Sequence, residues 1–215
     1  NCPGCIKASK MVHPDISFSF PVAPKDKISN PKSVDFISEF RSAVTANPYL
    51  NYQDWVSALE VENKQGLINI HEARNIIQRL SLKSSEGSFR VIILWYPEKM
   101  NVEAANCLLK ILEEPEEKTV FILVAEKAEH IPLTILSRTQ LVKVNRLSDD
   151  EVHKGLSQIP SIDPNLVRTV TQRVQGDYRL ALQLLQEEDP DADRTSTFLD
   201  WMRACLKLNV QKIQG

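Results

Sequence analysis

Two cysteines and one arginine are the residues of this chain whose types and spacing suggest chemistry. Cys2 and Cys5 have the C-x-x-C spacing of two zinc ligands, whereas a closed structural zinc site needs four. Arg138 follows an apolar segment, where its guanidinium group is free to bind a phosphate, a local carboxylate or water. The residues alone therefore give two of the four ligands that a zinc site needs, and one arginine whose partner they leave open.

The loop that cradles nucleotide phosphates is absent from these residues. Its motif, G-x-x-x-x-G-K-[S/T], brings bare backbone amides and a lysine to the phosphates. The chain has six glycines, and none is followed by lysine. Because the first residue is not methionine, we expect a fragment, and we expect any phosphate-binding loop to lie upstream of Asn1.

A strand–helix–strand unit must position Arg138. Two apolar runs, Val91–Leu94 and Val120–Val124, flank an amphipathic helix that begins after Asn101 and ends before Pro115. This order predicts parallel strands joined by a crossover helix. The predicted buried face of the helix consists of Ala105, Leu108, Leu109 and Leu112.

Two glutamates, Glu113 and Glu114, close this helix at the end where the helix dipole disfavours carboxylates. Two interpretations stay open from the residues alone. The pair is either a solvated acidic end or a partner for a cation on a neighbouring element or subunit.

Two motifs in this unit carry a family resemblance. Residues 105–115, ANCLLKILEEP, and residues 133–140, LTILSRTQ, resemble the AANALLKxLEEPP and SRC signatures of AAA+ subunits of bacterial DNA polymerase III clamp loaders. The resemblance is closest to the delta-prime type and is detailed from about Leu67 to Leu185. It implies an α/β fold with an AAA+ parallel sheet core of the P-loop NTPase kind, a small helical lid and the start of a helical collar domain.

The resemblance also assigns positions to the catalytic acids of the motor subunits. Those acids end a strand, hold Mg²⁺ and position the attacking water. Trp95 and Tyr96 occupy the two positions here, Glu98 comes two residues too late, and Glu126 stands where a motor has threonine. We therefore expect no ATP hydrolysis by this chain, and ATP binding itself comes into question.

Four site residues take their roles from the resemblance alone. Arg138 matches the SRC arginine, which projects into the ATP site of the adjacent subunit, although Thr139 replaces the cysteine of that motif. Arg179 resembles the sensor arginine of the lid helix. Cys2 and Cys5 match the last two ligands of a four-cysteine zinc module, so zinc is the expected cofactor and its other ligands would lie upstream.

The domain organisation follows from the same pattern. We expect a partial core at 1–146, containing a zinc-module remnant at 1–15 and a helical insertion at 25–66. A lid at 147–188 and the start of a collar at 189–215 complete the chain. The other elements expected are a strand at Ile16–Val22, helices capped by Ser33 and Asn51, a helix at Leu67–Leu82 whose capping box is Asn69–Glu72, a strand at Leu141–Val144, a helix capped by Ser148, helices at Pro164–Val174 and Asp177–Gln186, and a last helix at about Thr195–Leu208.

Charge and hydropathy restrict the function further. A formal net charge of −2 provides no global basic field for nucleic acid, and no apolar run reaches membrane-spanning length. Four unevenly placed cysteines do not form a secreted disulfide framework, so we expect a cytoplasmic protein.

The resemblance implies a non-motor, delta-prime-like subunit of the clamp loader, which places the sliding clamp on primed DNA. Its expected partners are the other loader subunits, the clamp and, through the assembly, DNA; no membrane partner is expected. The first alternative is an ATP-hydrolysing gamma/tau-type subunit with its phosphate-binding loop upstream. The second is a zinc-dependent nucleic-acid-binding module, which the near-neutral charge and the incomplete ligand set disfavour.

Overall fold

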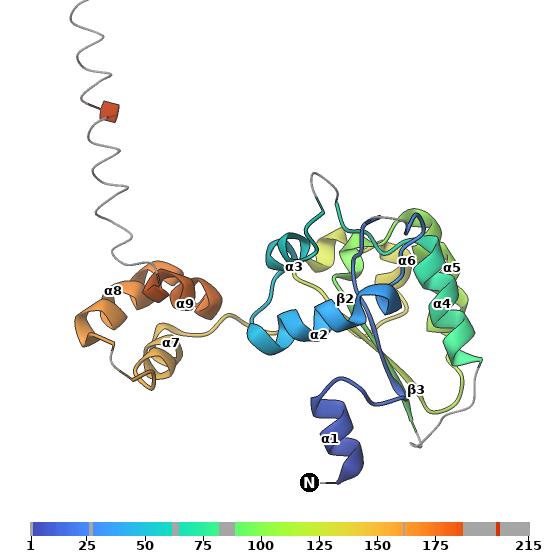
Figure 1. Ribbon diagram of the computed structural model, residues 1–215, viewed down its shortest axis with the longest axis horizontal. Coiled ribbons are helices and arrows are strands. Elements are labelled where there is room, and N and C mark those ends of the chain that lie inside the picture. The colour runs from blue at the N-terminus through green and yellow to red at the C-terminus, as the bar shows by residue number, and fades with distance from the viewer. Residues whose placement is uncertain are drawn as a thin grey trace, which may run out of the picture. The chain divides into compact units, whose positions relative to one another are not determined.

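The computed structural model describes residues 2–25, 28–61, 65–81, 89–160, 162–186 and 201–202. The chain divides into two compact units, Asn1–Val142 and Lys143–Gly215, which are described separately (Figure 1). The domain limits predicted from the sequence remain predictions. None of the described helices is long and apolar enough to cross a membrane.

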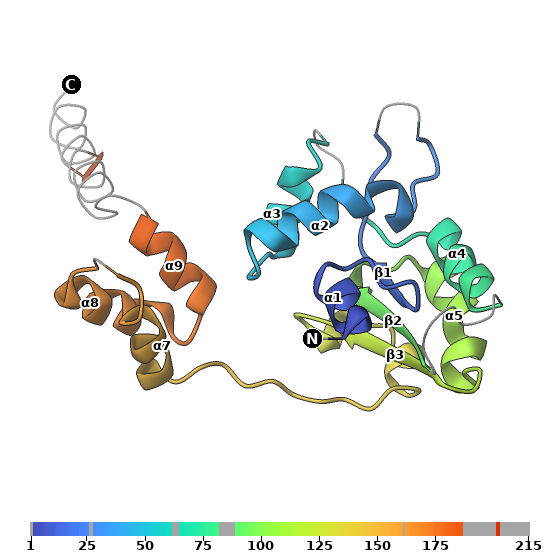
Figure 2. The same ribbon diagram turned by 60° about the horizontal axis from the view of Figure 1, so that its bottom comes forward.

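A parallel sheet forms the centre of the first unit. Its strands are β1 (Ile16–Ser19), β2 (Arg90–Trp95) and β3 (Thr119–Val124), in the order β1-β2-β3 (Figure 2). In the register, Ile93 of β2 lies between Phe18 of β1 and Ile122 of β3. The predicted parallel α/β core is thus confirmed.

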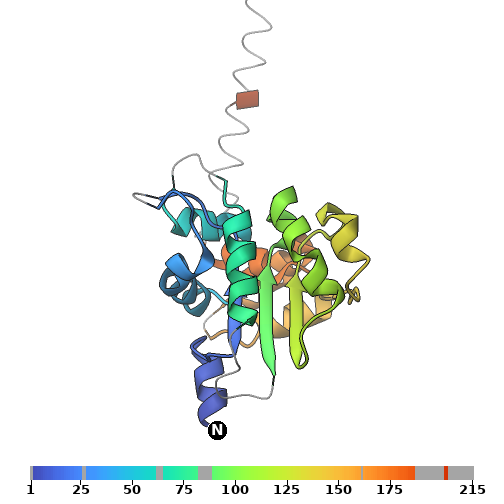
Figure 3. The ribbon, with the colours of Figure 1, turned by 90° about the vertical axis from the view of Figure 1, so that its right-hand side faces the viewer.

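Helix α5 (Val102–Glu113) connects β2 to β3 and packs beside α4 (Ile70–Leu80), as Figure 3 shows. The Asn101 side chain accepts a hydrogen bond from the Ala104 N–H, which satisfies one of the free amides of the first turn. The core between these helices and the sheet includes Ala73, Ile76, Leu80, Ile92, Leu94, Ala105, Leu108 and Leu112. The spacing of the apolar residues in the sequence therefore identified the buried face correctly, except that Leu109 is only partly buried.

The residues of the predicted insertion fold against the sheet. They form a 3-10 turn, η1 (Ser33–Phe36), and the helices α2 (Ile37–Ala46) and α3 (Tyr52–Ala58). An aromatic cluster joins them to the end of β1: the rings of Phe20 and Phe40 stack at 3.9 Å, and the Trp55 indole donates a hydrogen bond to the Pro21 carbonyl at 2.7 Å. The insertion therefore completes the core of this unit.

Two capping predictions in this unit are wrong, and in both cases the contacts found instead involve Ser33. Ser33 does not cap a helix; its hydroxyl accepts the Phe20 N–H and donates to the Phe20 carbonyl. Asn69 does cap α4, but Glu72 does not complete a capping box. Instead, the buried Glu72 carboxylate accepts the Ser33 N–H at 2.7 Å.

The strand predicted at Leu141–Val144 is also wrong. These residues have no regular structure, and Leu141, Val142 and Val144 are 69%, 76% and 90% exposed. A strand requires a neighbour for its backbone hydrogen bonds, and the described part of the chain places none beside this segment. Apolar β-branched residues alone did not create one.

Between residues 143 and 186, the described part of the second unit forms a cluster of helices, α7 (Asp149–Leu156), α8 (Pro164–Val174) and α9 (Tyr178–Gln186). Ser148 and Glu151 form the predicted capping box of α7. Gly176 joins α8 to α9 with φ of 82°, a left-handed conformation that suits glycine. The predicted helix at about Thr195–Leu208 lies outside the described residues except for Trp201 and Met202, which are helical.

Candidate functional site

The end of β2 carries two aromatic rings where the motor subunits of the resembled family carry acids. Trp95 is the last residue of the strand, and its ring lies 5.3 Å from that of Phe40 and 4.6 Å from that of Tyr96. Tyr96 is 7% exposed and has a left-handed backbone, with φ of 56° and ψ of 58°. This conformation costs about 1–3 kcal/mol for a residue other than glycine, so surrounding contacts must hold it.

The Tyr96 hydroxyl provides such contacts. It accepts the Tyr52 N–H from the first turn of α3 and donates to the Glu126 carboxylate, with both distances at 3.2 Å. Burial, as the main cause, raises the pKa of Tyr96 to about 12, so the phenol remains neutral at physiological pH. Tyr96 therefore ties the insertion to the carboxyl end of the sheet and offers no anionic metal ligand.

The carboxylates nearest to Tyr96 are those of Glu98 and Glu126. Glu98 Oε1 accepts the Glu126 N–H at 2.9 Å and the Lys127 N–H at 3.3 Å, which fixes the turn after β3. Glu98 Oε2 is buried and has no hydrogen-bond partner among the described residues. The part of the chain that the structure describes contains no group of three or more potential metal ligands. The sequence signals for Tyr96, Glu98 and Glu126 were their positions after β2 and β3, but nothing in the sequence pointed to Tyr52.

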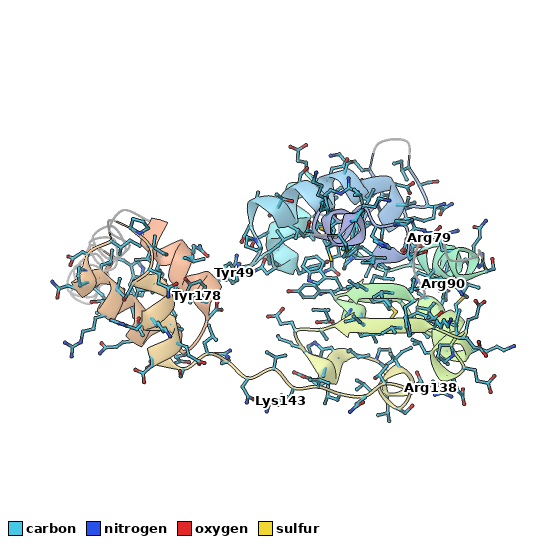
Figure 4. The ribbon with its side chains drawn as sticks, turned by 90° about the horizontal axis from the view of Figure 1, so that it is seen from below. Tyr49, Arg79, Arg90, Arg138, Lys143 and Tyr178 are labelled. Atoms are coloured by element: carbon cyan, nitrogen blue, oxygen red, sulfur yellow. The ribbon has the colours of Figure 1, made fainter. Side chains whose placement is uncertain are left out.

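Arg138 lies just after α6 (Leu133–Leu136), and Figure 4 labels it. Its Nε and Nη2 each lie 3.0 Å from Oε2 of Glu113, at the end of α5. Its Nη1 donates to the Thr134 carbonyl at 3.0 Å. The structure thus supports, for Glu113, the interpretation that the acidic end of the helix meets a cation on a neighbouring element. Its neighbour Glu114 is exposed.

The pair is accessible. The Arg138 side chain is 29% exposed and that of Glu113 is 58% exposed. An exposed ion pair contributes about 0–1 kcal/mol, so a better anion can replace Glu113 at low cost. The Arg138 guanidinium group is therefore held in a defined orientation, and another anion can take the place of Glu113 as its partner.

Arg179 lies in the first turn of α9, within the second unit, and its predicted sensor role remains a prediction.

The two cysteines lie at the start of α1 (Pro3–Ser9), and both are exposed. Their sulfur atoms are 3.1 Å apart, and Cys2 Sγ accepts the Cys5 N–H at 3.2 Å. Hydrogen bonds from Cys5, first from its side chain, lower the pKa of the Cys2 thiol, which favours the thiolate form that binds metals. The side-chain hydrogen bond with Cys2 raises the pKa of the Cys5 thiol, so the contact favours the thiolate at Cys2 only. The C-x-x-C spacing is that of two zinc ligands, and the described residues add no third ligand.

Comparison with known proteins identifies the family. A family model described as "DNA polymerase III, delta subunit" matches residues 1–148. This chain belongs to that family. The match includes β1 to β3, α5 and Arg138, and membership together with the parallel sheet confirms the predicted AAA+ type of fold.

Curated relatives of this DNA polymerase III family have three kinds of name. The chain is 30% identical over 122 residues to DNA polymerase III subunit gamma of Buchnera aphidicola, covering 54% of this chain and 34% of the relative. It is 28% identical over 120 residues to subunit delta' of Haemophilus influenzae, covering 56% and 37%. Subunit tau of Bacillus subtilis is 28% identical over 123 residues, covering 55% and 22%. The chain therefore spans about a third or less of the length of these relatives.

Among solved structures, a DNA polymerase III gamma subunit-related protein of Thermotoga maritima is 27% identical, with a TM-score of 0.43. The alignment covers 56% of this chain and 38% of the other.

Proposed function

We propose that this chain is part of a non-hydrolysing, delta-prime-like subunit of the DNA polymerase III clamp loader. The proposal rests first on family membership, which associates the chain with DNA polymerase III. Its partners would be the other loader subunits, the sliding clamp and, through the assembly, primed DNA. In this role the chain provides a rigid scaffold and offers one arginine to a neighbour.

The observation that carries the non-hydrolysing role is the end of β2. Trp95 and Tyr96 are both engaged in aromatic packing, and the Tyr96 phenol is neutral. Phosphoryl transfer needs carboxylates that hold Mg²⁺ and orient water. Of the two carboxylates at this edge, Glu98 accepts two backbone N–H groups through Oε1, and Glu126 accepts the Tyr96 hydroxyl through Oε2.

Arg138 is the group offered in trans under this proposal. A guanidinium group spreads positive charge over the oxygens of a transferring phosphoryl group, an effect of about 10³–10⁵ in rate. Glu113 holds it in place by an ion pair that a phosphate, carrying more negative charge, can displace.

The test is a loader reconstituted with the Arg138→Ala variant and assayed for ATP turnover stimulated by clamp and DNA. ATP turnover at the neighbouring site that receives Arg138 should fall by about 10³–10⁵, so only the turnover of the other ATP sites should remain. The loader should still assemble completely, as checked by its size. Arg138→Lys should restore little, because an ammonium lacks the planar fork. Arg74→Ala, at an exposed position of α4, is the matched control. Full activity from an assembled Arg138→Ala loader would refute the trans role.

The second candidate is an ATP-hydrolysing gamma/tau-type subunit, which relatives with those names favour. Phosphate release by the complete protein with Mg²⁺ separates the two. Saturable turnover that disappears in Glu98→Gln or Glu126→Gln would establish the second candidate, because these are the carboxylates at the end of the sheet.

A further inference from the structure

A cavity of about 200 Å³ lies beside the first half of β1. The loop 11–14, the strand residues Ile16 to Phe18, η1 and the helices α2 and α4 line it, and it is partly open to solvent. Its lining mixes polar and apolar groups, with Ile37 and Phe18 among the apolar ones, and two arginines contribute to it: Arg41 from α2 and Arg79 from α4. Figure 4 labels Arg79.

Neither arginine has a carboxylate partner among the described residues. Arg41 Nη2 donates to the Met11 carbonyl at 3.2 Å, and its Nε is buried without a hydrogen-bond partner in that part of the chain. Arg79 makes no hydrogen bond or ion pair with any described residue, and both side chains are half-buried. The cavity is therefore lined by two guanidinium groups that form no ion pair with a described carboxylate.

The acids on the same elements are engaged elsewhere. Glu39 of α2 accepts the Ser38 hydroxyl at 2.6 Å, and Asp35 of η1 accepts the Lys32 N–H at 2.8 Å. Glu72 of α4 accepts the Ser33 N–H. It interacts with Arg79 electrostatically, without a hydrogen bond. None of these carboxylates lines the cavity.

Half-buried guanidinium groups without a counter-ion are costly, because burial removes water and nothing replaces it. A tetrahedral oxyanion has enough acceptors for two guanidinium groups and enough charge to match them. A carboxylate would neutralise only one. We propose that this cavity binds a phosphate group, with Arg41 and Arg79 as its cationic ligands.

The site is separate from both functional regions described above. Ile16 pairs with Val91 at the start of β2, whereas Tyr96 follows the end of that strand. The cavity lining contains neither Arg138 nor Glu113. The inference therefore does not depend on the proposed clamp-loader role.

The test is a titration of the ¹⁵N-labelled chain with inorganic phosphate at constant ionic strength, followed through the arginine Nε–H signals. We expect saturable shifts centred on Arg41 and Arg79. Arg79→Ala should weaken binding by about tenfold, and Arg41→Gln should do the same, because each removes charge-assisted hydrogen bonds. Arg74→Ala, on the same helix but exposed, should bind as the wild type does.

Two further titrations identify the kind of ligand. Sodium acetate at the same concentration should give no saturable shift. A primed DNA duplex, added in competition with inorganic phosphate, distinguishes a nucleic-acid phosphate from a free phosphate. DNA that competes with inorganic phosphate assigns the site to the nucleic-acid backbone, and DNA that does not compete assigns it to a free phosphate.

Three results would overturn the proposal. They are the absence of a saturable phosphate response in the wild type, equal binding by a folded Arg41→Gln/Arg79→Ala double variant, and acetate binding as tight as phosphate. Circular dichroism of each variant establishes folding, and Arg79→Ala alone remains decisive if Arg41→Gln unfolds, because Arg79 makes no hydrogen bond to the described residues.

Discussion

Arg138 and Glu113 form a fork in which Nε and Nη2 of the guanidinium group each lie 3.0 Å from Oε2 of the carboxylate. The two residues are 25 positions apart and come from the ends of α6 and α5. The LEEP-like and SRC-like motifs are thus in direct contact. One motif supplies the arginine, and the other sets its orientation.

Replacing Glu113 with alanine should release the Arg138 side chain without destabilising the fold. Because the pair is exposed, the free energy of unfolding should change by no more than about 1 kcal/mol. The Arg138 Nε–H signal in ¹⁵N NMR should lose order and exchange faster with water. Glu114→Ala is the matched control and should leave the signal unchanged. An equally ordered Arg138 in the Glu113 variant would show that the Thr134 carbonyl alone holds it.

Because of the aromatic cluster, we expect the insertion at 25–66 to unfold together with the rest of the first unit. Trp55 is fully buried, contacts the rings of Phe20 and Phe40, and donates to the Pro21 carbonyl. Trp55→Ala should reduce the free energy of unfolding by about 3–5 kcal/mol, measured by urea denaturation. Phe89→Ala, at a position 58% exposed, should cost less than about 1 kcal/mol. A small loss at Trp55 would mean that the insertion unfolds independently.

The local elements of this fold were predictable because their signals are local. Asn51, Asn101 and Ser148 cap the helices that the sequence predicted, since a cap and its amides lie within three residues. The apolar spacing of α5 identified its buried face for the same reason.

The long-range polar contacts were not predictable from such signals. Tyr96 and Tyr52 are 44 residues apart, and Glu72 and Ser33 are 39 apart. Ser33 and Glu72 each matched a local capping pattern, but tertiary contacts used both side chains instead. The strand predicted at Leu141–Val144 failed because pairing depends on a neighbouring strand, which the composition of a segment does not report.

Tyr96→Phe should cost about 1–3 kcal/mol at pH 7, because the Tyr52 N–H and Glu126 both lose their hydroxyl partner. Burial raises the pKa of Tyr96 to about 12, above the ordinary tyrosine value of about 10, so folding favours the protonated phenol. That contribution is complete below pH 10 and is lost as the pH rises to 12. The free energy of unfolding, measured by urea denaturation, should therefore differ less between wild type and Tyr96→Phe as the pH rises from 10 to 12. A stability difference between wild type and Tyr96→Phe that stays constant up to pH 12 would contradict the buried phenol.

Glu72→Gln should become relatively more stable as the pH rises from 4 to 7. Burial, as the main cause, raises the pKa of the Glu72 carboxyl above its ordinary value, so the folded chain favours the protonated acid. Its contribution to stability is complete below the unfolded pKa and is lost as the pH rises through the folded pKa. The amide of the variant avoids this loss and keeps an oxygen that can accept the Ser33 N–H.

The measurement is urea denaturation of both proteins at several pH values. Glu39→Gln is a control in which the pH dependence has the opposite sign. The Ser38 hydroxyl lowers the pKa of Glu39, so the contribution of Glu39 to stability is lost as the pH falls. That control should be small, since Glu39 is largely exposed. A stability difference between wild type and Glu72→Gln that does not change with pH would show that the carboxyl titrates as it does in the unfolded chain. Glu72 would then be an ordinary hydrogen-bond acceptor between α4 and the insertion.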